Sequence, residues 1–398
     1  MKTLLAAVAG SIGVFAPLLL AQDQPVPPEA SPTTPANATV AETPRAQPTD
    51  DEAIRRGVEI ILAMQEGEAK AEWPYEGVYR VNGAIPIGYR IGGSAICAGA
   101  LLSAPGYAED AARKEAVARA AAFVISGTEQ PLMNPDYDGG YDVRGWGYTY
   151  ALEFLLRMKA ANATPEAIAA RADDTIRWYV RAIEQTEIPQ AGGWNYARPA
   201  GKGKVAAPSP FMTAPTLLAL FEAKRQGFEV DAGVVERAIR SLEAGRMESG
   251  GVTYAGAGEG KRDGVPGAVG RMMATETALF LAGRSTRANV RASLDAFITH
   301  WAWLDKRRAK PGTHQGPYAV APYYFYYAHE QAARAIELLP RHERAEYRRR
   351  LRELLFSVRL PDGSWNDRVF ARSASFGTAM AVLSLAQPSL PAPASWKP

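Results

Sequence analysis

A glycine-rich loop that carries aromatic residues recurs along this chain, and each copy leads into an apolar helix. The clearest copies lie at 192–196, 250–254 and 362–366, a fourth spans 139–148, and a weaker one is 73–75. Self-similarity of this kind is the signature of a repeat architecture, in which each unit buries its apolar face against its neighbours. The fold must therefore be read from the repeat before any single motif is considered.

The repeat contains two kinds of helix, and the first kind is amphipathic. In 165–184, for example, Ile168, Ala172 and Ile176 recur with the period of a helix that is apolar on one side. Helices of this kind are expected near 51–64, 110–125, 165–184, 231–245, 286–304 and 342–357. Their starts lie roughly 55 to 65 residues apart, which is long enough for a helix pair and a long loop.

The second kind of helix is apolar nearly all round and is expected near 95–102, 148–158, 216–223, 274–282, 323–338 and 378–385. A helix without a polar face must be buried on all sides. Six helices of each kind, in alternation, predict an all-α (α/α)6 toroid with an inner and an outer ring. An open solenoid is the alternative, but it would need polar capping repeats at both ends.

The toroid is expected over 51–388, with other kinds of segment before and after it. Lys2 and the apolar run 4–21 form a signal peptide over 1–21, for which an uncleaved membrane anchor is the alternative. Seven prolines and few large apolar residues make 22–50 a disordered linker, and 389–398 is a Pro-rich tail. We therefore expect an exported protein, periplasmic or extracellular, that contacts a membrane only through its N-terminal segment.

Charge and cysteine content exclude some classes of protein. The formal net charge is only +3, and the arginines of 341–352 alternate with glutamates at helical spacing, which indicates a solvated helix face and no nucleic-acid partner. Cys97 is the single cysteine, so no intrachain disulfide can form. Nothing in the sequence indicates the oligomeric state.

The connection between outer and inner helices resembles a known repeat. Gln190, Gly192 and Trp194 follow the order of Gln, spacer, Gly and Trp found in the terpene cyclase and protein prenyltransferase superfamily, which includes the squalene and hopene cyclases. The segment 362–365 keeps the end of this motif but has Arg359 where Gln is expected. The resemblance covers nearly everything after residue 50 and implies the α/α toroid fold.

The chemistries best known in this superfamily are not carried over with the repeat. The nearest string to the Asp-x-Asp-Asp acid of class II cyclases is 171–175, which lacks the first aspartate and lies on an outer helix. Cys97 has no acidic partner of the kind that zinc prenyltransferases use, and the four histidines form no ligand pair. We expect neither activity and no zinc site, and whether the protein is an enzyme stays open.

An acidic loop is the first candidate for chemistry. Asp136, Asp138 and Asp142, beside Arg144, could hold a hard cation such as Ca²⁺, or could divide into an acid and a base. Asp-Gly turns that serve only the backbone are the competing interpretation. No other cofactor is expected.

The mouth of the toroid is the second candidate. The N-termini of the inner helices converge there, and their partial positive charges favour an anionic or electron-rich ligand. The ligand-binding candidates are the aromatic residues and arginines expected at this mouth: Arg144, Trp146, Tyr148, Trp194, Tyr196, Arg198, Tyr254, Arg271, Tyr318, Tyr323 and Tyr324, with Arg372 nearby. The competing interpretation is structural, with arginines bonded to loop carbonyls and rings wedged between helix pairs.

Three functions remain open at this level. The first is a toroid that binds a small-molecule, lipid or glycan ligand at its aromatic and Arg-rich mouth. The second is a polysaccharide-active hydrolase or lyase, with catalytic candidates Asp136, Asp138, Asp142, Asp263, Asp367 and His314. The third is a tethered scaffold for protein interaction, which would show an exposed apolar patch and no ligand-sized pocket.

Overall fold

The computed structural model describes residues 47–137, 143–195, 206–256 and 263–398. These residues form twelve α-helices, and they contain isolated β-bridges but no β-strand. The expected signal peptide and most of the linker lie outside the described residues. Within them, no helix combines the length and the apolar content that a membrane crossing requires.

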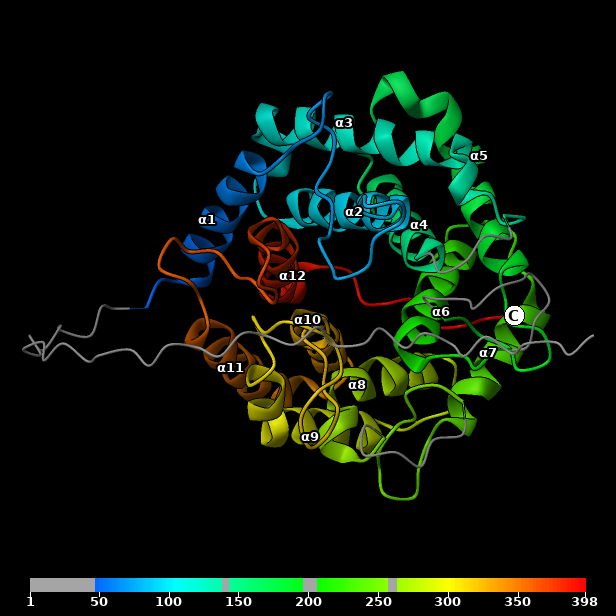
Figure 1. Cartoon of the computed structure of the whole chain (residues 1–398), viewed down its shortest axis with the longest axis vertical. Coiled ribbons are helices and arrows are strands. Elements are labelled where there is room, and N and C mark those ends of the chain that lie inside the picture. Colours follow the sequence, from blue (N-terminus) through cyan, green and yellow to red (C-terminus); the bar gives the residue numbers. More distant parts are fainter. Residues whose placement is uncertain (1–46, 138–142, 196–205, 257–262) are drawn as a thin grey trace, which may run out of the picture. The chain divides into compact units, whose positions relative to one another are not determined.

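The helices alternate between an outer and an inner ring (Figure 1). The outer helices are α1 (Asp50–Ala63), α3 (Ala111–Ser126), α5 (Glu166–Gln185), α7 (Ala232–Ala244), α9 (Arg287–Asp305) and α11 (Arg341–Ser357). The inner helices are α2 (Ile87–Ser103), α4 (Arg144–Ala160), α6 (Pro210–Arg225), α8 (Val265–Leu281), α10 (Tyr324–Ile336) and α12 (Ala374–Ala386).

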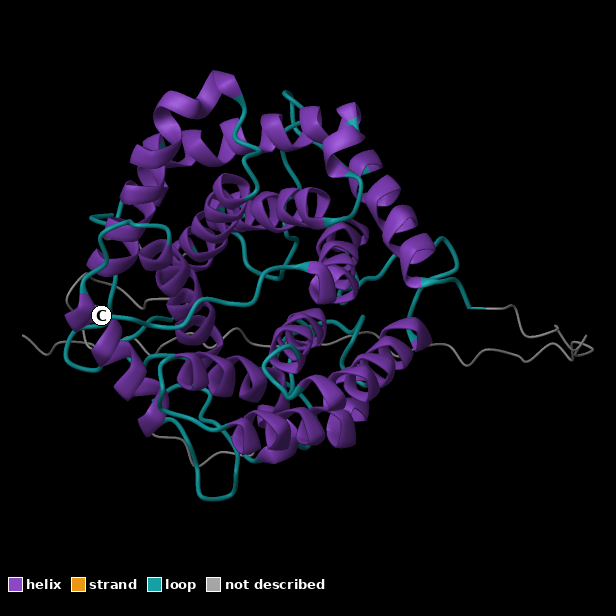
Figure 2. Cartoon of the chain, turned by 180° about the vertical axis from the view of Figure 1, so that it is seen from behind, coloured by secondary structure: helices purple, strands orange, loops and turns teal. Residues whose placement is uncertain are grey.

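The inner ring is closed. Each inner helix contacts the next, α12 contacts α2, and α1 packs against α12. Both views show the inner helices surrounded by the outer ones (Figures 1 and 2). The predicted (α/α)6 toroid is therefore confirmed and the open solenoid is excluded, because the first and last repeats cover each other.

The outer helices lie close to their predicted positions, whereas most inner helices begin earlier than predicted. The helix expected at 95 begins at Ile87, and the one expected at 274 begins at Val265. Their first turns contain glycine, proline or arginine, so the apolar run alone does not mark their starts. Glycine is also needed in the second turn of α2, because α2 and α4 pack closely: a Cβ on Gly92 would lie 2.4 Å from the Trp146 ring.

Three tryptophans of the repeated loop have the same structural role. Each indole Nε1 donates to a carbonyl at the end of the preceding outer helix: Trp73 to Ile61 O (2.6 Å), Trp194 to Ile183 O (2.8 Å) and Trp365 to Leu355 O (2.9 Å). The backbone N of each also donates to a hydroxyl on the following inner helix, at Ser94, Thr213 and Thr378 respectively. One residue therefore ties the outer helix, the loop and the inner helix together.

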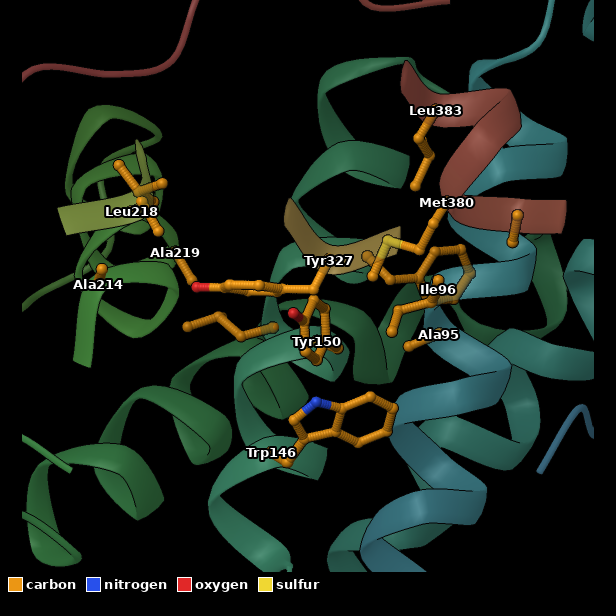
Figure 3. Packing of buried hydrophobic residues seen from close by; sticks show 14 of the residues in the cluster. Ala95, Ile96, Trp146, Tyr150, Ala214, Leu218, Ala219, Tyr327, Met380 and Leu383 are labelled. Atoms are coloured by element: carbon orange, nitrogen blue, oxygen red, sulfur yellow. The ribbon is translucent and has the colours of Figure 1, made fainter. Parts of the chain in front are cut away.

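Side chains of the inner ring fill much of its centre. Figure 3 shows Trp146 and Tyr150 of α4, Tyr327 of α10 and Met380 of α12 pointing toward the same space. The segment after α12 crosses the ring toward the C-terminus (Figure 2). Trp396 anchors this tail, since its ring stacks on Phe221 at 5.5 Å and its backbone N donates to Leu281 O (2.9 Å).

The tryptophan contacts predict a large stability effect. Trp365→Phe removes the bond to the Leu355 carbonyl and part of a fully buried ring, so the free energy of unfolding should fall by about 2–3 kcal/mol. Urea denaturation measures this value. Leu360→Ala, in the same loop but 37% exposed, is the control and should cost less than about 1 kcal/mol. Equal losses in the two variants would contradict the structural role of Trp365.

Candidate functional site

An aromatic cavity lies where the first turns of the inner helices meet the loops. It holds about 440 Å³ of space that atoms do not fill, part of it open to solvent. We call it the aromatic cavity, and its lining is Tyr75, Tyr79, Tyr89, Trp146, Tyr150, Phe211, Tyr323, Tyr327 and Phe376. Tyr89, Trp146, Phe211 and Phe376 each occupy the second or third position of an inner helix. Four of the six inner helices therefore place a ring near their N-terminal end, and all four rings line the aromatic cavity.

The rings of the aromatic cavity pack edge to face or tilted. Tyr89 stands nearly perpendicular to both Tyr75 (5.4 Å) and Trp146 (5.4 Å), and Tyr75 lies 4.6 Å from Phe376. These arrangements are the favourable ones for aromatic pairs. The rings therefore hold one another in place, and they present aromatic faces and a few hydroxyl groups to a ligand.

Asp367 is buried beside the aromatic cavity. Its Oδ2 accepts a hydrogen bond from the Tyr75 hydroxyl at 3.4 Å, while its Oδ1 has no hydrogen-bond partner among the described residues. Burial raises the pKa of this carboxyl to about 7, although the Arg368 charge opposes the rise. A carboxyl group that titrates near neutrality can donate or accept a proton at physiological pH.

The arginines predicted at the mouth bond to nearby loops. Arg271 is fully buried and donates to Thr253 O (2.9 Å), Val252 O (2.7 Å) and Gly267 O (3.1 Å). Arg144 donates to Asn134 O and lies over the Tyr137 ring. Arg372 pairs with Glu66 (2.9 Å) and Glu76 (3.2 Å). The structure thus favours the competing interpretation, in which these groups hold the loops in place.

The predicted aromatic residues are divided between the aromatic cavity and the helix packing. Trp146 and Tyr323 line the cavity. Tyr148 faces the outer ring, where its hydroxyl donates to Met133 O and its ring packs on Trp178 and Tyr179. Trp194 is held by its helix bond, Tyr318 packs on Trp303, and Tyr324 is buried against Phe211. Tyr196 and Arg198 lie outside the described residues.

His314 lies near the edge of the aromatic cavity in a polar cluster. Its Nε2 is 2.8 Å from the Tyr323 hydroxyl, its Nδ1 is 2.7 Å from Ala319 O, and its ring stands against Tyr254 at 4.7 Å. Asp263 is buried and accepts from the Tyr254 backbone N (2.5 Å), with Arg271 at 3.4 Å. Both nitrogens of His314 therefore have partners, and Asp263 fixes the start of a loop.

The acidic loop is described only in part. Asp136 is exposed, and its backbone N donates to Asn134 Oδ1 at 2.9 Å in a local turn. Asp138 and Asp142 lie outside the described residues. No group of three or more potential metal ligands occurs in the part of the chain that the structure describes. Calcium binding at Asp136, Asp138 and Asp142 stays a prediction.

A cluster of buried charges lies deeper in the ring and was not predicted. Arg334 of α10 pairs with Glu330 and with Glu153 of α4, and Arg157 pairs with Glu153 at 2.8 Å. Burial raises the pKa of Glu330. Burial acts in the same direction on Glu153, but Arg334 and Arg157 outweigh it and hold the pKa of Glu153 below its usual value. Each helix carries a Glu and an Arg four residues apart, a pattern that is unexpected in an apolar helix and could have revealed the cluster.

The charge cluster separates two further spaces. A space of about 290 Å³ lies between it and the aromatic cavity and is lined partly by Tyr150, Ile96 and Met380. A larger one, about 730 Å³ with solvent included, lies on the other side and is bounded by the tail residues 390–394. The Pro-rich tail therefore packs over the end of the ring opposite the aromatic cavity.

Similarity to known proteins is confined to the fold. No protein-family model matches this chain, and no curated protein matches it. Among solved structures, the type II terpene cyclase MstE from Scytonema is 14% identical, with a TM-score of 0.51, over 85% of this chain and 98% of that one. The α-1,6-mannanase GH76A from Salegentibacter sp. HEL1_6 is 11% identical, with a TM-score of 0.55, over 86% and 99%. The chain shares the α/α toroid fold of these enzymes.

The raised pKa of Asp367 predicts a pH-dependent stability. The contribution of Asp367 to the free energy of unfolding is fully present below about pH 4, near the pKa of the group in the unfolded chain. This contribution is lost as the pH rises through about 7. Asp367→Asn should therefore match the natural chain at pH 4 and exceed it at pH 8, by about 2–4 kcal/mol in the free energy of unfolding.

Asp362→Asn is the matched control for this measurement. The Ser364 hydrogen bonds lower the pKa of Asp362, so its contribution is lost as pH falls, and this variant should lose stability at pH 8. Urea titrations at both pH values measure the two effects. Parallel pH profiles for Asp367→Asn and the natural chain would show that Asp367 is not held protonated.

The charge cluster predicts a second large effect on stability. Arg334→Met leaves Glu153 and Glu330 buried with only one arginine, and should lower the free energy of unfolding by about 3–5 kcal/mol at pH 7. Adding Glu330→Gln should recover at least half of the loss, because one buried charge is removed. Arg349→Met, in an exposed pair network on α11, is the control and should cost less than about 1 kcal/mol.

Proposed function

We propose that this protein binds an apolar ligand in the aromatic cavity of the toroid. The observation that carries the proposal is the convergence of nine aromatic side chains from five inner helices or their flanking loops on one space of about 440 Å³. Ligand sites are typically concave and mostly apolar, with a few polar groups that orient the ligand. The tyrosine hydroxyls and the nearby Asp367 are the polar groups here.

The chemistry of the cavity favours a hydrocarbon or aromatic body over a sugar. A glycan needs many hydrogen bonds, and a glycosidase needs two carboxyl groups across one cleft. No carboxylate lines the aromatic cavity among the described residues, and Asp367 reaches it only through Tyr75. A variant of the terpene cyclase MstE has been solved with geranylgeranyl dihydroxybenzoate, an apolar chain with an aromatic head, within the same fold.

The scaffold function has less support. Large apolar residues that are exposed in the described part of the chain are single and scattered, at Val78, Leu132, Leu360 and Val369. Such residues are normal on a protein surface. We also propose, from the N-terminal sequence, that the chain is exported and that the linker 22–50 separates the toroid from the signal or anchor segment.

A neutral aromatic probe tests the proposal. 2-Naphthol should bind the natural chain and quench its tryptophan fluorescence, because Trp146 lines the aromatic cavity. Phe376→Trp places a larger ring in the cavity and should weaken binding at least about ten-fold, which corresponds to roughly 1.4 kcal/mol. Tyr148→Phe, on α4 but facing the outer ring, is the control and should bind as the natural chain does.

Two results would count against an apolar ligand. Equal affinity of the natural chain and Phe376→Trp for 2-naphthol would place the binding elsewhere. Binding of α-1,6-mannotriose, with no binding of 2-naphthol, would favour the glycan function instead.

A further inference from the structure

Buried polar atoms without partners gather at one place beside the aromatic cavity. Of the eight such side-chain atoms in the described residues, five belong to Arg307, Tyr326, Asp367 and Arg368. The two loops involved are joined by a backbone bond from Ala309 N to Asp367 O at 2.8 Å. Buried polar atoms normally have partners, so a concentration of this kind indicates a place where a ligand, an ion or water completes the bonds.

Arg368 is the central member of this group. Only 3% of its surface is exposed, and its Nε and Nη2 have no hydrogen-bond partner within the described ranges. Arg368 forms no ion pair within 4 Å with a carboxylate in that part of the chain. Its backbone N donates to Asn366 Oδ1, and its guanidinium lies 5.8 Å from the Phe370 ring centre. A buried guanidinium without a counter-ion is costly, and a bound anion would remove that cost.

Arg307 adds a second cation to the same place. Its Nη2 donates to Pro311 O (2.8 Å) and Thr313 O (3.1 Å), which leaves its Nε without a partner among the residues described. The bond from Ala309 N to Asp367 O brings the loops of the two arginines together, and the like charge of Arg368 adds to burial in lowering the pKa of Arg307. Together they offer three unused N–H donors, more than the one unused oxygen of Asp367 can accept.

This arginine pair lies next to the aromatic cavity. The Tyr75 hydroxyl, which donates to Asp367 Oδ2, belongs to a ring that lines the cavity. The Arg368 charge also opposes the rise that burial causes in the pKa of Tyr75 and Tyr89, two neighbouring rings of the lining. The arginine pair is therefore connected to the aromatic cavity through Asp367 and Tyr75.

We propose that Arg368 and Arg307 bind an anionic group, of the phosphate or carboxylate class, on the ligand whose apolar body fills the aromatic cavity. The ligand is then an anionic amphiphile, and this inference rests on the proposed function. Guanidinium groups suit such oxyanions because their N–H donors match the spacing of two oxygens. A neutral Asp367 carboxyl can donate a further hydrogen bond to the same group.

A matched pair of probes tests the anionic group. 2-Naphthyl phosphate and 2-naphthol share one apolar body, and isothermal titration should show the phosphate binding the natural chain at least about ten-fold more tightly. Arg368→Gln should reduce that ratio to about one and leave the affinity for 2-naphthol within about two-fold, since only the charge-assisted bonds are lost. Arg372→Gln, in the same loop but paired with Glu66 and Glu76, is the control and should keep the ratio.

Two further variants guard against misfolding. If Arg368→Gln does not fold by circular dichroism, Arg307→Gln and Arg368→Lys replace it, and both should lower the ratio while 2-naphthol still binds. Arg307 is only half-buried, so its substitution is the milder one.

The outcomes separate this inference from the proposed function. Equal binding of the two probes to the natural chain would overturn the anionic group and leave the apolar cavity in place, with water completing the bonds of Arg368. If 2-naphthol fails to bind but inorganic phosphate raises the melting temperature in an Arg368-dependent way, the arginine pair is supported as an anion site and the apolar body is overturned. Failure of both naphthyl probes and of phosphate would overturn both proposals.

Discussion

The six inner helices have no continuous polar face, and this property determines the rest of the structure. Each must be covered by two inner neighbours and by an outer helix, and only a closed ring gives the first and last helices the same cover as the others. Closure brings α2 and α12 together, which are separated by most of the chain. The aromatic cavity depends on that contact, since Tyr89 and Phe376 come from these two helices.

The repeated loop sets how each outer helix is placed relative to the next inner helix. Its tryptophan fixes the end of an outer helix and, through a hydroxyl, the first turns of the next inner helix. Those first turns carry Tyr89, Phe211 and Phe376, whose rings line the aromatic cavity. The aromatic cavity is thus a consequence of the same repeat that builds the fold, and substitutions in the loop would alter both.

Polar groups occur in the interior at two levels with different character. The deeper cluster of Glu153, Arg157, Glu330 and Arg334 is internally paired and neutral in formal charge, which suits a structural role in the middle of the ring. The group around Asp367 and Arg368 is different, because several of its atoms have no partner in the described part of the chain. A buried network in which every polar atom has a partner stabilises a single packing. Where buried polar atoms lack partners, a bound group can form the missing hydrogen bonds.

Helix type, number and order followed from the sequence, because apolar periodicity and glycine placement are local properties that need no knowledge of distant contacts. The outer helices and the ring closure were predicted correctly, and Trp146, Tyr323 and Asp367 were among the candidate residues. Tyr89, Phe211 and Phe376 were missed because their inner helices begin before their apolar runs, so the first-turn aromatic positions could not be recognised. Which ring faces the cavity, which arginine holds a loop and which carboxyl is deprived of water were decided only by the tertiary structure, since burial and the direction of a side chain depend on residues hundreds of positions away.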